Sequence, residues 1–185
     1  MRRIRQLEVV MQINLSELFT TEGMQKQYQI PIEMNVFQSP AGNYPITECK
    51  PVELCITHVK NRNLEIRGSL DLHLQIPCDR CLEPVDIHIQ TEIEKDVDMN
   101  LSEGERVENL DEQPYISGHN LDVDVLVCDE LIVNMPMKVL CSEDCKGICN
   151  RCGANLNHGT CDCDVTELDP RMSVIRDIFK NFKEV

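Results

Sequence analysis

Leu64-Glu-Ile-Arg-Gly-Ser-Leu-Asp-Leu-His-Leu-Gln-Ile76 alternates apolar with polar residues, and after a short loop Val85-Asp-Ile-His-Ile-Gln-Thr-Glu-Ile93 does the same. A period of two predicts strands with one buried face. Because Pro77–Cys81 forms a tight loop between the two stretches, we expect an antiparallel hairpin there. A similar stretch at Pro51–Lys60 precedes them, separated by Asn61-Arg62-Asn63. Consecutive strands of this kind predict an antiparallel meander or a small barrel-like sheet.

Two helices are expected in the second half of the chain. Asp122 and Asp124 can cap a helix over about residues 124–134, which Pro136 ends. The apolar positions of this helix recur at helical spacing and predict its buried face, made of Val125, Cys128, Ile132 and Met135. Asp169-Pro170 opens a final helix, with aspartate as the cap and proline at the first position, where a missing N–H costs nothing.

The net charge of the 185-residue chain is strongly acidic, at −14. Phosphate repels such a protein, so it is not expected to coat nucleic acid with its whole surface. Nine acidic and two basic residues fall between Glu92 and Glu112, so this stretch alone carries −7. A run of this kind is usually a solvated loop or insertion, and its alternative role is a docking strip for a basic partner.

The compartment and the cysteine count point to metal binding. No apolar run approaches the ~20 residues needed to cross a bilayer, and none follows the basic start Met1–Gln6. We therefore expect a cytoplasmic protein with no secretory signal and no membrane contact. Eleven cysteines are an odd number in a setting where disulfides are rare. Thiolate metal ligation is the remaining common use of so many cysteines.

Six cysteines fall within the 23 residues 141–163, and four of them form our preferred site. Cys149-x-x-Cys152 places two thiolates at one corner of a tetrahedral site, and Gly153 allows the tight turn behind them. In an extended backbone Cys161 and Cys163 face the same side. The first site is therefore expected to hold zinc through these four cysteines.

The remaining cysteines can form a second zinc site, so the sequence leaves open whether the chain holds one or two ions. Cys78 and Cys81 lie at the predicted hairpin turn and can join Cys141 and Cys145. The alternatives are a shuffled quartet, for instance with Cys145 in place of Cys161, and a site in which His158 replaces a cysteine. We expect His158 to be exposed instead. The other thiols are expected in the core or at the surface: Cys49, Cys55 and Cys128.

Sites made only of thiolates favour a structural role over a catalytic one. Such sites are closed and electron-rich, whereas a hydrolytic zinc keeps an open position for water. We find no phosphate loop, dinucleotide motif or Ser/His/Asp pattern, so we expect no enzyme and no small-molecule substrate. Cys78 and Cys81 leave open a thiol redox protein or a metal-responsive sensor. A metal store or chaperone is a further alternative.

The expected fold class is α+β: an antiparallel meander or small barrel-like sheet with a few helices and a C-terminal cysteine-rich zinc module. Residues 27–36 add a strand, and residues 8–20 add a short strand leading into a short helix. We expect a β-rich α+β domain at residues 1–136, with an acidic insertion at about 94–120. Residues 137–185 would then form the zinc-binding module and its closing helix.

Several motifs, in order along the chain, resemble the YceD family, whose members are described as large ribosomal RNA subunit accumulation proteins. The motifs are Pro77-Cys-Asp-Arg-Cys-Leu-Glu-Pro84, Asp129-Glu-Leu-Ile132, Cys145-Lys-Gly-Ile-Cys-Asn-Arg-Cys-Gly-Ala-Asn-Leu-Asn157, Cys161-Asp-Cys163 and Asp169-Pro-Arg171. The resemblance covers the chain from about Ile13 to Phe179. The chain departs from the family pattern at Asn150, where proline is common, but every cysteine is in place.

The resemblance implies a non-catalytic role in accumulation of 23S ribosomal RNA and in biogenesis of the large ribosomal subunit. It carries no catalytic residues to transfer. The expected partners are 23S rRNA or its precursor, a basic ribosomal protein of the large subunit, or both. RNA contact would need a locally basic face around the metal module, and the candidates are Lys146, Arg151, Arg171, Arg176 and Lys180.

Overall fold

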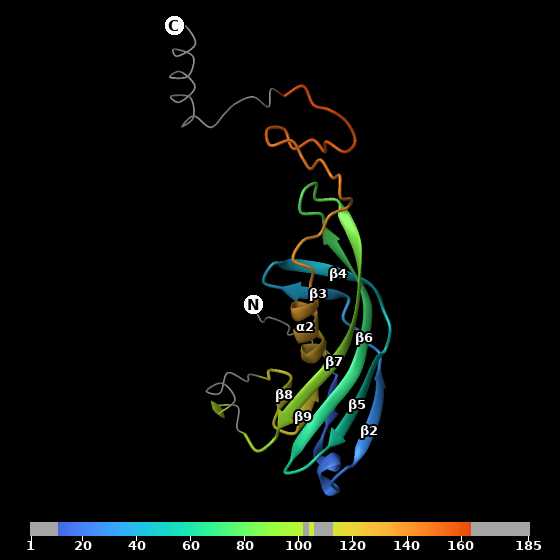
Figure 1. Cartoon of the computed structure of the whole chain (residues 1–185), viewed down its shortest axis with the longest axis vertical. Coiled ribbons are helices and arrows are strands. Elements are labelled where there is room, and N and C mark those ends of the chain that lie inside the picture. Colours follow the sequence, from blue (N-terminus) through green and yellow to red (C-terminus); the bar gives the residue numbers. More distant parts are fainter. Residues whose placement is uncertain (1–10, 102–103, 106–112, 164–185) are drawn as a thin grey trace, which may run out of the picture. The chain divides into compact units, whose positions relative to one another are not determined.

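The computed structural model describes residues 11–101, 104–105 and 113–163. The strands are β1 (Gln12–Asn14), β2 (Gln25–Ile30), β3 (Val36–Ser39), β4 (Gly42–Cys49), β5 (Val52–His58), β6 (Asn63–Pro77), β7 (Pro84–Asp98), β8 (Ile116–Ser117) and β9 (Asn120–Asp122). The helices are η1 (Ser16–Thr20), a 3-10 helix, and α2 (Val123–Asn134) (Figure 1). The final helix expected from Asp169-Pro170 lies outside the described residues.

The described chain falls into two compact units. The first, which we call the sheet unit, comprises residues 11–76 and the described part of 84–139. The second, which we call the cysteine unit, comprises residues 77–83 and 140–163. The hairpin loop between β6 and β7 therefore groups with residues far along the chain. The domain division expected between residues 136 and 137 stays a prediction about independent folding.

Strand β6 is the centre of the larger sheet, whose order is β2-β5-β6-β4-β3, with β7 also paired to β6. The first half of β6 pairs antiparallel with β5, from His58↔Leu64 to Glu53↔Ser69. Its second half pairs antiparallel with β4, at Cys49↔Leu72. A smaller sheet has the order β1-β9-β8. The α+β class with an antiparallel sheet is thus confirmed.

The strand expected at residues 27–36 is wrong as a single element. β2 ends at Ile30, and β3 begins only at Val36. Pro31 follows directly after β2, and proline has no N–H to donate to a strand partner. The two strands lie at opposite ends of the sheet order.

The acidic stretch begins inside a strand, which corrects its description as an insertion starting at about residue 94. β7 continues to Asp98 because apolar positions keep alternating with the acidic ones. Ile93 and Val97 are buried, whereas Glu94 and Asp96 are exposed on the other face. The charge of residues 92–98 is therefore the solvent side of a half-buried strand.

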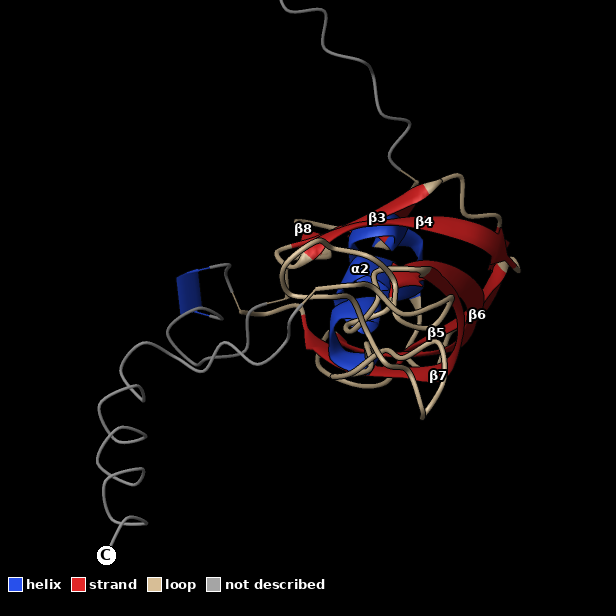
Figure 2. Ribbon diagram, turned by 90° about the horizontal axis from the view of Figure 1, so that it is seen from above, coloured by secondary structure: helices blue, strands red, loops and turns tan. Residues whose placement is uncertain are grey.

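Helix α2 begins and ends where the sequence predicts, but its buried face differs. The Asp122 side chain caps the helix by accepting a hydrogen bond from Val125 N at 3.1 Å. Ile132 was expected in the core and is 54% exposed. The other three expected residues, Val125, Cys128 and Met135, are partly buried and pack against the core. The fully buried residues are Val123, Leu126, Val127, Glu130 and Leu131. Figure 2 shows the strands of the sheet unit curving around this helix. Ile132 and Val133 are apolar and exposed, so apolar side chains alone do not mark its buried face.

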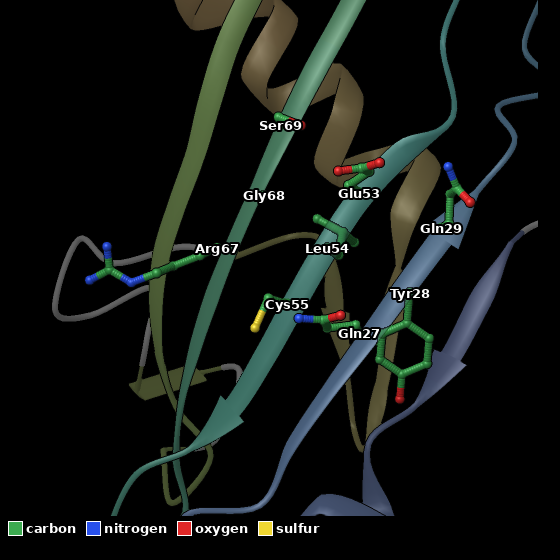
Figure 3. Close-up of a pocket in the computed structure, with 9 residues that line it drawn as sticks. All are labelled: Gln27, Tyr28, Gln29, Glu53, Leu54, Cys55, Arg67, Gly68 and Ser69. Atoms are coloured by element: carbon green, nitrogen blue, oxygen red, sulfur yellow. The ribbon is translucent and has the colours of Figure 1, made fainter.

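A polar hollow lies on the surface of β2, β5 and β6 (Figure 3). Gly68, one of its lining residues, is paired with Leu54 across β6 and β5. A Cβ atom at Gly68 would lie 2.4 Å from the Glu53 carbonyl oxygen. The close approach of β5 and β6 at this point therefore requires glycine. The cation in the lining, Arg67, already donates hydrogen bonds to Glu65 and Glu94.

Candidate metal centre

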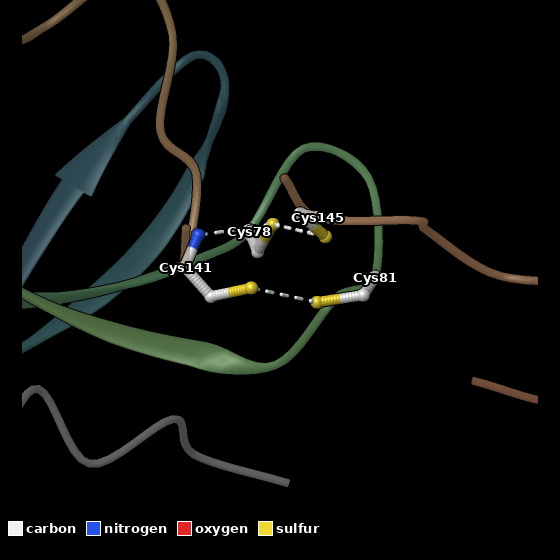
Figure 4. Close-up of side chains that lie close together, drawn as sticks. All are labelled: Cys78, Cys81, Cys141 and Cys145. Carbon is white, nitrogen blue, oxygen red and sulfur yellow. Dashed lines mark hydrogen bonds between the residues drawn. The ribbon is translucent and has the colours of Figure 1, made fainter. Parts of the chain in front are cut away.

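Four cysteine thiols from two distant segments meet in the cysteine unit. Cys78 and Cys81 come from the hairpin loop, and Cys141 and Cys145 follow the sheet unit in sequence. Their sulfur atoms all lie within 4.8 Å of one another. Cys78 Sγ is 3.8 Å from Cys145 Sγ, and Cys81 Sγ is 3.5 Å from Cys141 Sγ (Figure 4). We call this group cluster A.

The hairpin loop has the tight geometry that two neighbouring thiols need. Cys78 N donates to the Glu83 carbonyl at 2.8 Å, and Leu82 N donates to the Cys78 carbonyl at 2.9 Å. Leu82 adopts the left-handed region, with φ of 63°. The chain reverses within these residues, so the side chains of Cys78 and Cys81 point inward and are 0% and 5% exposed.

The segment that follows Cys145 lies against the hairpin loop at a glycine, Gly147. Gly147 has φ of 78°, and a Cβ atom there would lie 3.0 Å from the Arg80 carbonyl oxygen. Ile148 N donates to that carbonyl at 3.1 Å, and Arg80 Nη1 donates to the Cys145 carbonyl at 2.8 Å. The positive φ and this close approach both favour glycine at position 147.

The other four cysteines of the C-terminal segment form cluster B. Cys149, Cys152, Cys161 and Cys163 also place their sulfur atoms within 4.8 Å of one another. Gly153 has φ of 73° and donates its N–H to the Cys149 carbonyl at 2.9 Å. Arg151 N points at Cys149 Sγ, at 3.4 Å. This is the knuckle geometry expected from the Cys-x-x-Cys-Gly spacing.

The pKa values of the thiols diverge within each cluster. Burial raises the pKa of Cys78, but hydrogen bonds from backbone N–H groups outweigh it and lower the pKa to about 6. At Cys81 a backbone hydrogen bond lowers the pKa, yet burial and the neighbouring thiols raise it to about 12. In cluster B, backbone hydrogen bonds lower the pKa of Cys149 to about 6, whereas the Cys152 thiol and burial raise that of Cys163 to about 12.

This divergence follows from the crowding of like charges, because the first thiolate in a cluster opposes ionisation of the next. A dication at the centre would remove the opposition and let all four thiols ionise. The donor set of each cluster, four soft sulfur atoms and no oxygen, suits a tetrahedral metal ion. Both clusters can therefore hold a metal ion.

The structure sorts the expected ligands into the two quartets of the sequence analysis. Cys145 lies in cluster A and Cys161 in cluster B, so the shuffled quartet does not form. His158 belongs to neither cluster, and its side chain is 71% exposed. Cys49, Cys55 and Cys128 are half-buried in the sheet unit. Whether the quartets ligate metal stays a prediction.

The redox alternative needs an accessible nucleophile. Cys78 has the lowered pKa that such a thiol requires, but its side chain is fully buried. Moreover, Cys78 and Cys81 lie in a hairpin loop and do not open a helix. These features suit metal ligation better than thiol exchange.

The expected RNA-binding residues are only partly described. Lys146 and Arg151 are exposed in the cysteine unit. Lys146 follows Cys145 of cluster A, and Arg151 lies between Cys149 and Cys152 of cluster B. The other three candidates, Arg171, Arg176 and Lys180, lie outside the described residues.

The residues that surround cluster A were missed from the sequence. Asn157 Nδ2 donates to Cys145 Sγ at 3.3 Å, and Cys141 N donates to Cys78 Sγ at 3.4 Å. Glu83 is hydrogen-bonded by the Cys81 thiol at 3.6 Å and by His158. The one signal available was the paired Asn155 and Asn157 in a loop without apolar periodicity, which is typical of side chains bonded to the backbone.

Comparisons with known proteins identify the family to which the chain is similar. A family model described as large ribosomal RNA subunit accumulation protein YceD matches residues 66–179, which is 114 of the 185 residues. A curated relative from Arabidopsis thaliana, large ribosomal RNA subunit accumulation protein YCED homolog 1, chloroplastic, is 37% identical over 49 residues. The match covers 26% of this chain and only 15% of that relative. No solved structure matches. Among the described helices, none has the length and apolarity needed to cross a bilayer.

Proposed function

This chain belongs to the YceD family, and on that basis we propose that it promotes accumulation of 23S rRNA and biogenesis of the large ribosomal subunit without catalysing a reaction. The family match over more than half of the chain carries this proposal. The site chemistry supports the non-catalytic part. Four thiolates fill the corners of a tetrahedral site and leave no position for substrate or water.

Zinc is the metal that we propose for both clusters. It prefers four sulfur ligands in tetrahedral geometry and has no redox chemistry of its own. When bound, it would cross-link the hairpin loop to residues 141–163 and stabilise a region that has few apolar side chains. In the described part of the cysteine unit most of the buried hydrophobic positions are the cysteines themselves.

We propose two kinds of partner, both in the cytoplasm. The first is 23S rRNA or its precursor, contacted by basic residues around the clusters such as Lys146 and Arg151. The second is a basic ribosomal protein of the large subunit, held by the acidic face of β7. Glu92, Glu94 and Asp96 are exposed on that face. Acidic side chains in a row suit a basic protein and repel RNA.

The test is to make this chain the sole family member in a cell and to measure mature 23S rRNA relative to 16S rRNA. We expect the ratio to fall on deletion and to be restored by the intact chain but not by Cys81→Ser. Replacement of a half-buried cysteine outside the clusters, Cys55→Ser, is the matched control and should restore the ratio. A ratio that does not change on deletion would contradict the proposed role.

Co-sedimentation separates the two partners. We expect the protein on precursor particles of the large subunit. Lys146→Glu with Arg151→Glu should release it if RNA contact dominates. Neutralising Glu92, Glu94 and Asp96 to the amides should release it if a basic protein dominates. Finding the protein only in the ribosome-free fraction of growing cells would contradict both.

A further inference from the structure

The loop that closes cluster B also forms part of the wall of cluster A. Cys152 and Cys161 bracket residues 153–160, and all eight of those residues lie between two ligands of cluster B. Yet side chains of this loop contact residues of cluster A. The two clusters therefore share a segment of the chain.

Asn157 makes the most direct of these contacts. Its Nδ2 donates to Cys145 Sγ at 3.3 Å, while its Oδ1 accepts from Lys146 N at 2.7 Å. The Asn157 side-chain amide thus fixes the backbone next to Cys145 and also donates a hydrogen bond to the Cys145 sulfur. Donors to a metal-bound thiolate stabilise its negative charge and fix its direction. An aspartate or an alanine at this position could not make both bonds.

His158 makes a second contact from the same loop. Its Nε2 forms a hydrogen bond with Glu83 Oε1, and the other oxygen of Glu83 accepts from the Cys81 thiol at 3.6 Å. The Glu83 carbonyl also accepts from Cys78 N at 2.8 Å. His158 is therefore linked, through Glu83, to both cysteines of the hairpin loop.

The backbone joins the clusters as well. Ile148 and Asn155 form an antiparallel bridge, and Leu156 N donates to the Gly147 carbonyl at 2.9 Å. Gly147 and Ile148 are the residues that pack on Arg80 of the hairpin loop. Three short segments, 78–83, 145–149 and 153–158, thus form one hydrogen-bonded stack.

We propose that the two clusters bind metal cooperatively, with Asn157 as the positioning residue that couples them. A metal ion in cluster B joins the ends of the 153–160 loop and limits its conformations. Asn157 and His158 are then already near cluster A when its metal arrives. Binding of the first ion has already reduced the conformational entropy of the loop. The second ion therefore orders less of the chain and binds more tightly. By linkage, metal in cluster A strengthens cluster B by the same factor.

This inference rests on the proposal that the clusters hold metal, and it adds that they do not act independently. Outer partners of metal ligands typically change affinity by about 10- to 100-fold. We therefore expect cluster A to lose about tenfold in zinc affinity when cluster B is removed.

The test compares zinc affinity at cluster A, by competition with a chromophoric chelator at one fixed pH, in four forms of the full chain. These are the unaltered chain, Cys161→Ser with Cys163→Ser, Asn157→Ala, and all three changes together. Cadmium NMR assigns the resonances of the two sites. We expect about a tenfold loss on removing cluster B, a loss of similar size in Asn157→Ala, and a smaller further loss when both are combined.

The control is Asn43→Ala, which removes an exposed asparagine side chain of the sheet unit and should leave cluster A within about twofold, as is usual for surface positions. Equal affinity of cluster A with and without cluster B would overturn the coupling while leaving two-site metal binding intact. If Asn157→Ala behaves like the control although removing cluster B weakens cluster A, the coupling holds but the role of Asn157 is overturned. A chain that binds no metal would overturn both this inference and the proposed zinc.

Discussion

Cys78 and Cys145 are 67 positions apart in the sequence, and their sulfur atoms lie 3.8 Å apart in a buried site. The contact belongs to a unit that is discontinuous in the chain, because residues 77–83 interrupt the sheet unit between β6 and β7. The Cys78 and Cys81 side chains of the hairpin loop lie close to those of Cys141 and Cys145, as a shared metal ion would require.

Replacing Lys95 with methionine should destabilise the sheet unit by about 2 kcal/mol, between the values for buried and exposed ion pairs. Lys95 Nζ lies 2.8 Å from Glu130 Oε1 and 3.2 Å from Asp129 Oδ2 of α2. The Glu130 side chain is only 7% exposed, so the substitution would leave a buried carboxylate without its lysine partner. Methionine keeps the packing of the lysine stem. Urea unfolding measures the change.

The matched control is Lys50→Met. Lys50 pairs with Asp71 at 2.7 Å, but its side chain is 64% exposed. This change should destabilise the sheet unit clearly less than Lys95→Met, because water screens an exposed ion pair. Equal effects of the two substitutions would show that the Lys95 contact to α2 contributes no more than a surface ion pair.

Gly68→Ala should destabilise the sheet unit by about 1–3 kcal/mol, the usual cost of overpacking. The new Cβ would lie 2.4 Å from the Glu53 carbonyl oxygen and 2.7 Å from a Leu54 methyl carbon. Since the first of these is a backbone atom, β5 and β6 must separate. Gly104→Ala, which meets nothing within 4 Å, is the control for thermal unfolding. Unchanged stability of Gly68→Ala would contradict the strand spacing described here.

The strands were predictable where one short-range pattern decides the structure. The alternation in 64–76 and 85–93 gave β6 and β7, and Asp122 marked the start of α2. The same rule misled at residues 27–36, because the pattern of side chains takes no account of the N–H that Pro31 lacks. It also misled for the face of α2. There the surrounding strands enclose Leu126, Val127 and Leu131 and leave Ile132 exposed.

The cysteines of cluster B could be grouped from spacing because Cys-x-x-Cys and Cys-x-Cys are local geometries. Those of cluster A could be grouped only because Cys141 and Cys145 were left without partners. The support around the clusters could not be predicted. Asn157, Glu83 and Arg80 contact cluster A only through folding of the whole unit, and each is a common residue with no distinctive spacing. Their role depends on tertiary contacts such as the approach of Gly147 to Arg80, which no sequence period encodes.

Zinc affinity should rise steeply with pH around neutrality. Without metal, Cys81 and Cys163 keep their protons at neutral pH because their pKa values are raised to about 12, and the pKa values of Cys141 and Cys161 are raised as well. Zinc must displace these protons, so lower pH opposes binding. At least two such thiols in each cluster predict a loss of at least about 100-fold in affinity per pH unit of acidification.

Chelator competition over a series of pH values measures this slope, and proton release in weakly buffered solution checks it independently. The thiols whose pKa is lowered to about 6, Cys78 and Cys149, add to the slope only at more acidic pH. An affinity that does not change with pH would mean that the ligands are not these thiols.

The number of metal ions bound per chain tests the account most directly. Native mass spectrometry of protein purified without oxidation should show two zinc ions in the intact chain and in Cys55→Ser. Cys81→Ser should retain one ion, because it removes a ligand of cluster A and leaves the quartet of cluster B. Two ions in Cys81→Ser, or none in the intact chain, would contradict the assignment of clusters A and B as two four-thiolate zinc sites.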